Sequence, residues 1–179
     1  HVRTRKEAYT IAESYTEQLA AEPDSRAVFA VEEHGHGVYM YTFSGDHAVW
    51  TYSTVGKPFP LHVTAAGKSI LSRLPRDRVE TIIDQHGLEP ETENSITTRD
   101  ALLEELDEID ERGYAYNHEE QLDGVKAVGV PVCRSNGQVL GAFSVASPAN
   151  RMKGEWFENE LPETILATAN EFELQVSLT

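Results

Sequence analysis

Strand-forming residues occur in two separate groups in this sequence, and short turns that contain glycine interrupt each group. Such short turns join antiparallel strands, whereas parallel strands need long crossover connections. Segments with helical spacing lie before, between and after the two groups. The chain is therefore predicted to be an α+β protein with an antiparallel sheet, not a doubly wound parallel sheet. The predicted strands are residues 27–32, 38–44, 47–53, 114–117, 126–134 and 138–147.

Five segments carry apolar residues at the spacing of an amphipathic helix. Thr64 is suited to cap the second helix, Gly87 to end the third, and Thr97 with Asp100 to form a capping box for the fourth, which Gly113 ends. Ser, Asn and Gly at 135–137 predict the turn between the last two strands, and a proline lies in the first turn of the final helix. The predicted helices are residues 3–21, 64–74, 76–86, 98–112 and 161–176.

The length of 179 residues predicts one domain. We expect residues 1–22 to be a linker helix and residues 23–179 to be the domain itself. The charged start has no apolar signal segment, and no run is long enough to span a membrane. Because the first residue is His and not Met, the chain is expected to begin inside a longer protein or to carry the remnant of a tag. Its single cysteine, Cys133, has no partner for a disulfide, which fits a reducing cytoplasm.

The charge is strongly negative. Thirty Asp and Glu residues face fifteen Lys and Arg, which gives a net charge of −15. A nucleic-acid surface needs clustered Lys and Arg, so this segment is not expected to bind DNA by itself. Acidic residues are spread over the whole chain, which favours adaptation to a high-salt cytoplasm as a hypothesis, since a hydrated anionic surface stays soluble there.

The segment Gly67-Lys68-Ser69 matches the end of a phosphate-binding P-loop. The P-loop also needs a glycine five residues earlier, where this chain has His62, and an apolar strand directly before it. Here two prolines precede the segment and disfavour a central strand. A nucleotide-using enzyme is therefore a weak alternative.

The same helix start has a second interpretation. Thr64 as N-cap, followed by Ala65, Ala66 and Gly67, leaves backbone N–H groups that can bind a carboxylate or another anion. The small side chains are equally suited to close packing of the helix against the sheet. The residues by themselves leave both interpretations open.

Other polar residues give weaker predictions. Glu119 and Glu120 are adjacent, so on an extended segment they point in opposite directions and make a poor acid/base pair; a solvated acidic loop is expected. The seven histidines have no zinc-site spacing, so no metal and no cofactor are predicted. Ser144 lacks the Gly-x-Ser-x-Gly pattern of a hydrolase nucleophile, so a hydrogen bond in a pocket is the expected role.

Three motifs follow one another in a defined order and spacing. They are PLHVTAAGKSIL at residues 60–71, RGY at 112–114 with EE at 119–120 and GVKAVGVPV at 124–132, and LGAFSVASP at 140–148 followed by Arg151. Together they resemble the IclR family of bacterial and archaeal transcription regulators. The resemblance covers essentially the whole chain, and residues 3–21 match the linker helix of that family.

The resemblance implies a GAF-like effector domain, in which helices flank an antiparallel sheet. It implies a winged helix-turn-helix before residue 1, which alone would contact DNA. It also implies assembly into a homodimer or homotetramer, a small organic acid or aromatic compound as effector, and no membrane association. The ligand-binding residues that it implies are Phe59, Ala65, Ala66, Asn117, Val125, Ala127, Ser144 and Ala146.

The chain departs from the pattern of members that bind small keto acids. Those members tend to have Asp at the position of Asn117, Cys near Ala127 and Ser at Ala146. Each lost partner leaves a ligand polar atom unpaired, at a cost of about 1–3 kcal/mol. We therefore expect a ligand larger or less polar than glyoxylate or pyruvate, such as a sugar acid or an aromatic acid.

The expected function is effector sensing within a DNA-binding regulator, without catalysis. Two alternatives remain. One is an enzyme that uses residues 64–69 to bind phosphate or carboxylate, and the other is a dimerisation module that binds no ligand.

Overall fold

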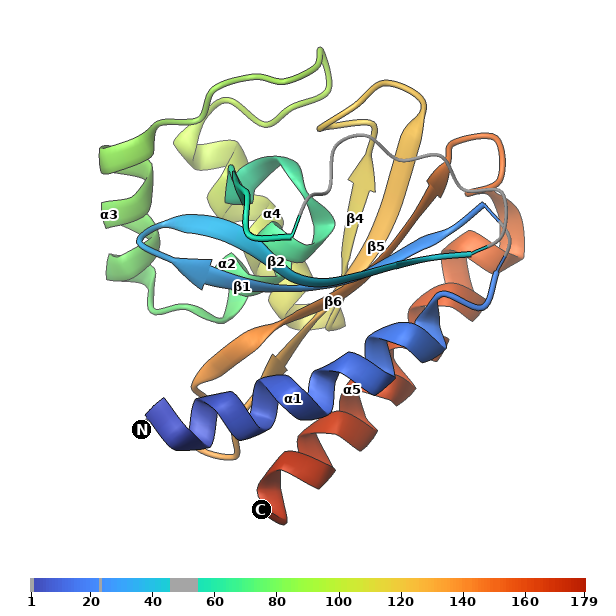
Figure 1. The fold of residues 1–179 in the computed structure, drawn as a ribbon. Coiled ribbons are helices and arrows are strands. Elements are labelled where there is room, and N and C mark those ends of the chain that lie inside the picture. Colours follow the sequence, from blue (N-terminus) through green and yellow to red (C-terminus); the bar gives the residue numbers. More distant parts are fainter. Residues whose placement is uncertain (1, 23, 46–54) are drawn as a thin grey trace.

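The structure is a computed structural model that describes residues 2–22, 24–45 and 55–179 (Figure 1). Among these residues, six strands form one antiparallel sheet in the order β3-β2-β1-β6-β5-β4. This agrees with the predicted α+β class. The predicted strand at 47–53 lies outside the described residues. The strands are β1 (Arg26–Glu33), β2 (His36–Ser44), β3 (Pro58–Phe59), β4 (Ala115–His118), β5 (Val125–Cys133) and β6 (Val139–Pro148).

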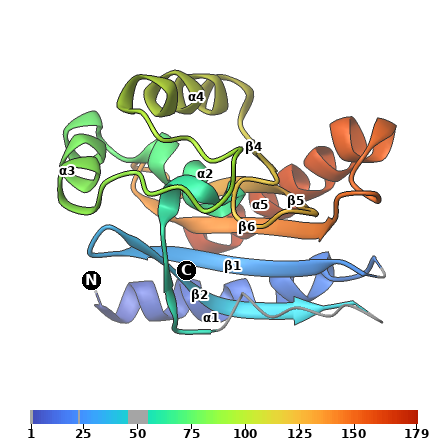
Figure 2. The ribbon, with the colours of Figure 1, turned by 90° about the horizontal axis from the view of Figure 1, so that it is seen from above.

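Helices cover both faces of the sheet (Figures 1 and 2). Helices α1 (Val2–Leu19) and α5 (Leu161–Ser177) lie on one face. The other face carries α2 (Ala65–Arg73), preceded by the short 3-10 helix η1 (Leu61–Val63), together with α3 (Arg76–His86) and α4 (Arg99–Arg112). A π-helical turn at Trp156–Glu160 leads into α5.

Alternation along the strands supplies a separate hydrophobic core to each helical layer, because successive side chains point to opposite faces of a sheet. In β1, Ala27 and Phe29 pack towards α1 and α5, whereas Val28 and Ala30 pack towards α2. A polar residue on the α2 face of a strand therefore points into the layer where η1, α2 and α4 meet the sheet.

The helix at the N-terminus belongs to the same packed body. Ala8, Ala12 and Leu19 are buried in the core beneath α1 and α5. The hydroxyl of Tyr15 donates a hydrogen bond of 2.7 Å to Gln175, and its ring meets Phe172 edge to face. The start of α1 and the end of α5 lie at the same side of the molecule (Figure 1).

Most predicted boundaries agree with the structure. Gly113 adopts a left-handed conformation at the end of α4, and Gly137 does so in the turn between β5 and β6. The predicted capping box at Thr97 and Asp100 is wrong: Thr98 is the N-cap and accepts from the amide of Ala101. Two adjacent threonines offer the same hydroxyl, and the backbone conformation selects the second. None of the helices in the described ranges is long and apolar enough to cross a membrane.

Candidate functional site

Four adjacent strands each place one residue in a single row across the sheet. Asn117 of β4 lies opposite Ala127 of β5, which lies opposite Ala146 of β6. Ala146 in turn lies opposite Arg26 of β1. Neighbouring strands are about 4.8 Å apart, so the row spans roughly 14 Å. The two alanines in its middle leave a hollow between a guanidinium at one end and a carboxamide at the other.

This hollow is the floor of a cavity of about 40 Å³, which we name the central pocket. Ser144 extends the floor by one row, where it lies opposite Val28 and Gly129. The start of α2 and the loop after β4 form the remaining described walls. The described lining residues are Arg26, Val28, Tyr39, Thr64, Ala65, Ala66, Asn117, Gln121, Leu122, Val125, Ala127, Ser144 and Ala146.

Helix α2 begins in the wall of the central pocket. Thr64 is its N-cap, as predicted, and its Oγ1 accepts from the amide of Gly67 at 2.8 Å. Within the described ranges, the amides of Ala65 and Ala66 donate to no other residue. Close packing is also present, because a Cβ on Gly129 would lie 2.7 Å from the Ala65 backbone. The helix start therefore packs tightly and leaves two amides for an anion.

The polar side chains of the floor are held by the protein and keep part of their hydrogen-bonding capacity. Asn117 Oδ1 accepts from the amide of Glu120 at 2.8 Å, so its Nδ2 is the group left to donate. Ser144 Oγ donates to the carbonyl of Val128 at 2.9 Å, so its lone pairs remain as acceptors.

Arg26 is the charged member of the described pocket lining, and the sequence analysis missed it. Burial lowers the pKa of the Arg26 guanidinium from its ordinary value, and the nearby Tyr39 offsets part of this shift. The guanidinium nevertheless stays protonated, as arginine does in proteins. Arg26 directly precedes the predicted strand 27–32. Arg26 lies two residues before Val28, and alternate residues of a strand point to the same face. This spacing could have predicted that Arg26 faces α2, as Val28 does.

Behind the start of α2, Lys68 makes a buried ion pair. Its side chain is 0% exposed, and its Nζ lies 2.8 and 3.1 Å from the two carboxylate oxygens of Glu120 and 3.1 Å from Glu105. Glu120 Oε2 also accepts from the amide of His118 at 2.8 Å. The predicted solvated loop is therefore wrong for Glu120, which turns inward because Lys68 supplies a counter-charge. The ion pair occupies the amine that a P-loop lysine would offer to phosphate.

The central pocket contains every predicted ligand-binding residue except Phe59. The ring of Phe59 stacks on Tyr39 with centroids 4.2 Å apart, and Tyr39 lines the pocket in its place. The predicted residues that the structure brings together are Ala65, Ala66, Asn117, Val125, Ala127, Ser144 and Ala146. Thr64, predicted as the N-cap of the helix start, also lines the pocket. The lining residues that were not predicted are Arg26, Val28, Tyr39, Gln121 and Leu122.

Known proteins resemble this chain in sequence and in fold. A probable HTH-type transcriptional regulator ArcR from Halobacterium salinarum is 31% identical over 98% of this chain and 68% of its own length. The crystal structure of the Thermotoga maritima IclR is 28% identical, with a TM-score of 0.87 over 95% of this chain and 68% of that chain.

A third relative has a bound aromatic acid. The inducer-binding domain of the PobR transcription factor from Acinetobacter, as a double mutant in complex with 3-hydroxybenzoic acid, is 28% identical. Its TM-score is 0.83, over 92% of this chain and 96% of that chain. Several curated relatives, such as the Escherichia coli KdgR regulator, are longer: the chain covers only 45% of that protein.

The family model for the C-terminal region of the bacterial transcriptional regulator IclR matches residues 1–174. Together with the fold shared with the Thermotoga maritima IclR, this match shows that the chain belongs to the IclR family of transcriptional regulators, as its C-terminal domain.

Proposed function

We propose that the central pocket binds the carboxylate of a small organic effector. The observation that carries this proposal is the convergence of donors on one hollow: the guanidinium of Arg26, the amides of Ala65 and Ala66, and Asn117 Nδ2. An arginine and a helix N-terminus both favour negative charge. Val28, Leu122 and the alanines of the floor supply the apolar part of the wall.

The effector that we propose is an aromatic acid or a sugar acid. The apolar wall and the paired alanines Ala127 and Ala146 favour a ligand body beyond a two- or three-carbon keto acid. The 3-hydroxybenzoic acid in the PobR domain supports the aromatic class. A cavity of about 40 Å³ holds only a few waters, so binding must displace wall side chains. Gln121 and Leu122, on the loop after β4, are suited to move because no strand pairing holds them.

Effector binding is proposed to act on DNA through a helix-turn-helix domain that precedes residue 1, with α1 as the connection. A ligand shifts such an equilibrium only by its different affinity for the two states. Assembly as a homodimer or homotetramer in the cytoplasm belongs to the same proposal. The buried pairing of Lys68 with Glu120 supports a sensor and not a phosphate-using enzyme.

A ligand panel tests the proposal. The chain is titrated with 3-hydroxybenzoate, 4-hydroxybenzoate, a hexuronate and pyruvate, and the melting temperature and calorimetric binding are measured. We expect stabilisation by an aromatic or sugar acid, and loss of that stabilisation in Ala146→Leu, which fills the hollow. Ser72→Ala, on the outer part of α2, is the matched control. Stabilisation by pyruvate alone contradicts the proposed ligand class, and no binding across the panel favours a ligand-free dimerisation module.

A further inference from the structure

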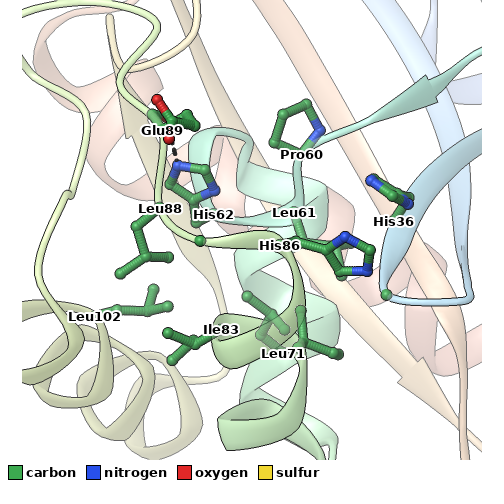
Figure 3. A pocket seen from close by; sticks show the side chains of 13 residues that line it. His36, Pro60, Leu61, His62, Leu71, Ile83, His86, Leu88, Glu89 and Leu102 are labelled. Carbon is green, nitrogen blue, oxygen red and sulfur yellow. Dashed lines mark hydrogen bonds between the residues drawn. The ribbon is translucent and has the colours of Figure 1, made fainter.

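A second cavity lies between α3 and the sheet-facing helices, and the proposed effector site does not include it. Its volume is about 120 Å³, three times that of the central pocket. We name it the α3 cavity (Figure 3). Its lining residues are Gly35, His36, Pro60, Leu61, His62, Leu71, Ile82, Ile83, His86, Gly87, Leu88, Glu89 and Leu102.

The floor of the α3 cavity is apolar. Leu71, Ile83, Leu88 and Leu102, from α2, α3, the following loop and α4, surround its lower part in Figure 3. None of these residues lines the central pocket. The two cavities adjoin different parts of the η1–α2 segment, so a variant can fill one and leave the other unchanged.

The rim of the α3 cavity carries imidazoles. The ring of His86 lies 4.1 Å from that of His36, and its Nε2 lies 3.0 Å from the carbonyl of His34. Gly35 makes this approach possible: its φ is +86°, and a Cβ there would lie 2.6 Å from His86 Nε2. The rim is therefore held by a turn in which other residues would be strained.

His62 supplies the hydrogen-bonding group of the interior. It is 5% exposed, and its Nε2 lies 2.8 Å from the carbonyl of Glu89. A carbonyl only accepts, so Nε2 carries the hydrogen and Nδ1 of the neutral ring is an acceptor. Burial lowers the pKa of His62, which favours the neutral ring. Among the described residues Nδ1 has no hydrogen-bond partner, and in Figure 3 it faces away from Glu89, towards Leu61 and His86.

We propose that the α3 cavity is a second ligand site, which takes a neutral, ring-sized molecule with one hydroxyl group, such as a phenol, that donates to His62 Nδ1. The size is suitable, because an engineered apolar cavity of about 150 Å³ binds benzene. The described lining of the interior offers an acceptor and no Lys or Arg. The hydroxyl of a phenol is therefore satisfied there, whereas a carboxylate loses its hydration without compensation. The α3 cavity thus offers a hydrogen-bond acceptor to a neutral ligand, whereas the central pocket offers hydrogen-bond donors to the proposed anion.

The experiment is a titration with phenol, followed by methyl NMR of Leu71, Ile83 and Leu102. We expect saturable shifts at these methyl groups, with a dissociation constant of about a millimolar or weaker for so small a ligand. Fluorobenzene has the same size without the hydroxyl and is expected to bind about two- to tenfold more weakly, the worth of one neutral hydrogen bond. Benzoate is expected to leave these methyl groups unshifted.

Two variants locate the site. Leu88→Phe extends a half-buried loop side chain into the α3 cavity and is expected to abolish the phenol shifts, whereas Ala146→Leu fills the central pocket and is expected to preserve them. Melting temperatures of both variants check that they fold. Shifts at Ala127 and Ala146 in place of the α3 cavity overturn the proposal, as do the absence of saturable shifts and equal binding of benzoate or fluorobenzene. None of these results depends on whether the central pocket binds an effector.

Discussion

Arg26 stands at the start of β1 and brings a positive charge to the lining of the central pocket. It lies in one row with Ala146, Ala127 and Asn117, so the proposed anionic effector would meet this charge at one end of the row. The row also explains why short residues lie between the two polar ones: any longer side chain at 127 or 146 would fill the hollow.

Arg26→Gln is expected to weaken the binding of a carboxylate effector by about 10- to 100-fold, because a charge-assisted hydrogen bond contributes about 1.5–3 kcal/mol. Calorimetric titration with an acid from the panel measures the loss. Arg26→Lys keeps the charge but not the planar fork and is expected to lose less. Unchanged affinity in Arg26→Gln would exclude Arg26 as the carboxylate partner.

Lys68 links three parts of the chain through its carboxylate partners on α4 and on the loop after β4. Replacing it with Met leaves Glu120 buried without a counter-charge. The expected loss is about 3–5 kcal/mol in the free energy of unfolding, measured by urea denaturation. The double variant Lys68→Met with Glu120→Gln removes both charges and is expected to recover part of that loss. If Lys68→Met unfolds with the same free energy as the unchanged chain, the ion pair with Lys68 does not hold Glu120 in its buried position.

At the scale of elements, η1 and α2 are the segment on which the site depends. They place Thr64, Ala65 and Ala66 on the central pocket and Leu61 and His62 on the α3 cavity. Such close contact needs glycine at two points. A Cβ on Gly67 would lie 2.1 Å from the carbonyl oxygen of Leu61, and Gly129 has the same role on β5. Both glycines have negative φ or extended backbone, so the requirement is space.

The substitution Gly67→Ala tests whether helix propensity or close packing dominates the stability at this position, because the two predict opposite changes. Propensity predicts a gain of up to about 1 kcal/mol, whereas the contact with Leu61 predicts a loss of about 1–3 kcal/mol through overpacking. We expect the loss to dominate, because the clashing atom is backbone and cannot rotate away. Urea denaturation measures the change, with Gly87→Ala as a control at a glycine that has no neighbour within 4 Å but a φ of +71°. A gain in stability for Gly67→Ala would contradict the packing described here.

At the scale of the whole molecule, the acidic surface and the anion-binding pocket have opposite electrostatic preferences. The net charge of −15 repels an acidic effector at long range, so the donors around the central pocket must act locally. The same charge is consistent with DNA contact being made by another domain.

If the acidity is an adaptation to high salt, the melting temperature should continue to rise between about 0.3 M and 2 M KCl, where simple screening of surface charge is already nearly complete. Thermal unfolding followed by circular dichroism measures this rise. Sorbitol at equal osmolality serves as the control for general exclusion from the protein surface. A melting temperature that stays constant above 0.3 M KCl would contradict the hypothesis.

The sequence by itself determined the class of fold, five of the six strands in the described ranges and the N-cap at Thr64. The edge strand β3 at Pro58–Phe59 was not predicted, because two residues are too few to show an alternating pattern. Periodicity and turn residues are local properties, and the three motifs carried the family resemblance. The resemblance also implied Asn117, Ser144 and the alanines as ligand-binding residues, and the structure places them together in the lining of the central pocket.

Only the tertiary structure decided which distant residues share one row. Arg26 is more than ninety residues from Asn117 in the chain, and only the strand order β1-β6-β5-β4 brings them to the same pocket. The inward turn of Glu120 has the same cause, because its counter-charge, Lys68, lies on another element. Tyr39 lines the central pocket, whereas Phe59, which was predicted to line it, stacks on Tyr39. These outcomes depend on register and on close packing between layers, which no local pattern in the sequence encodes.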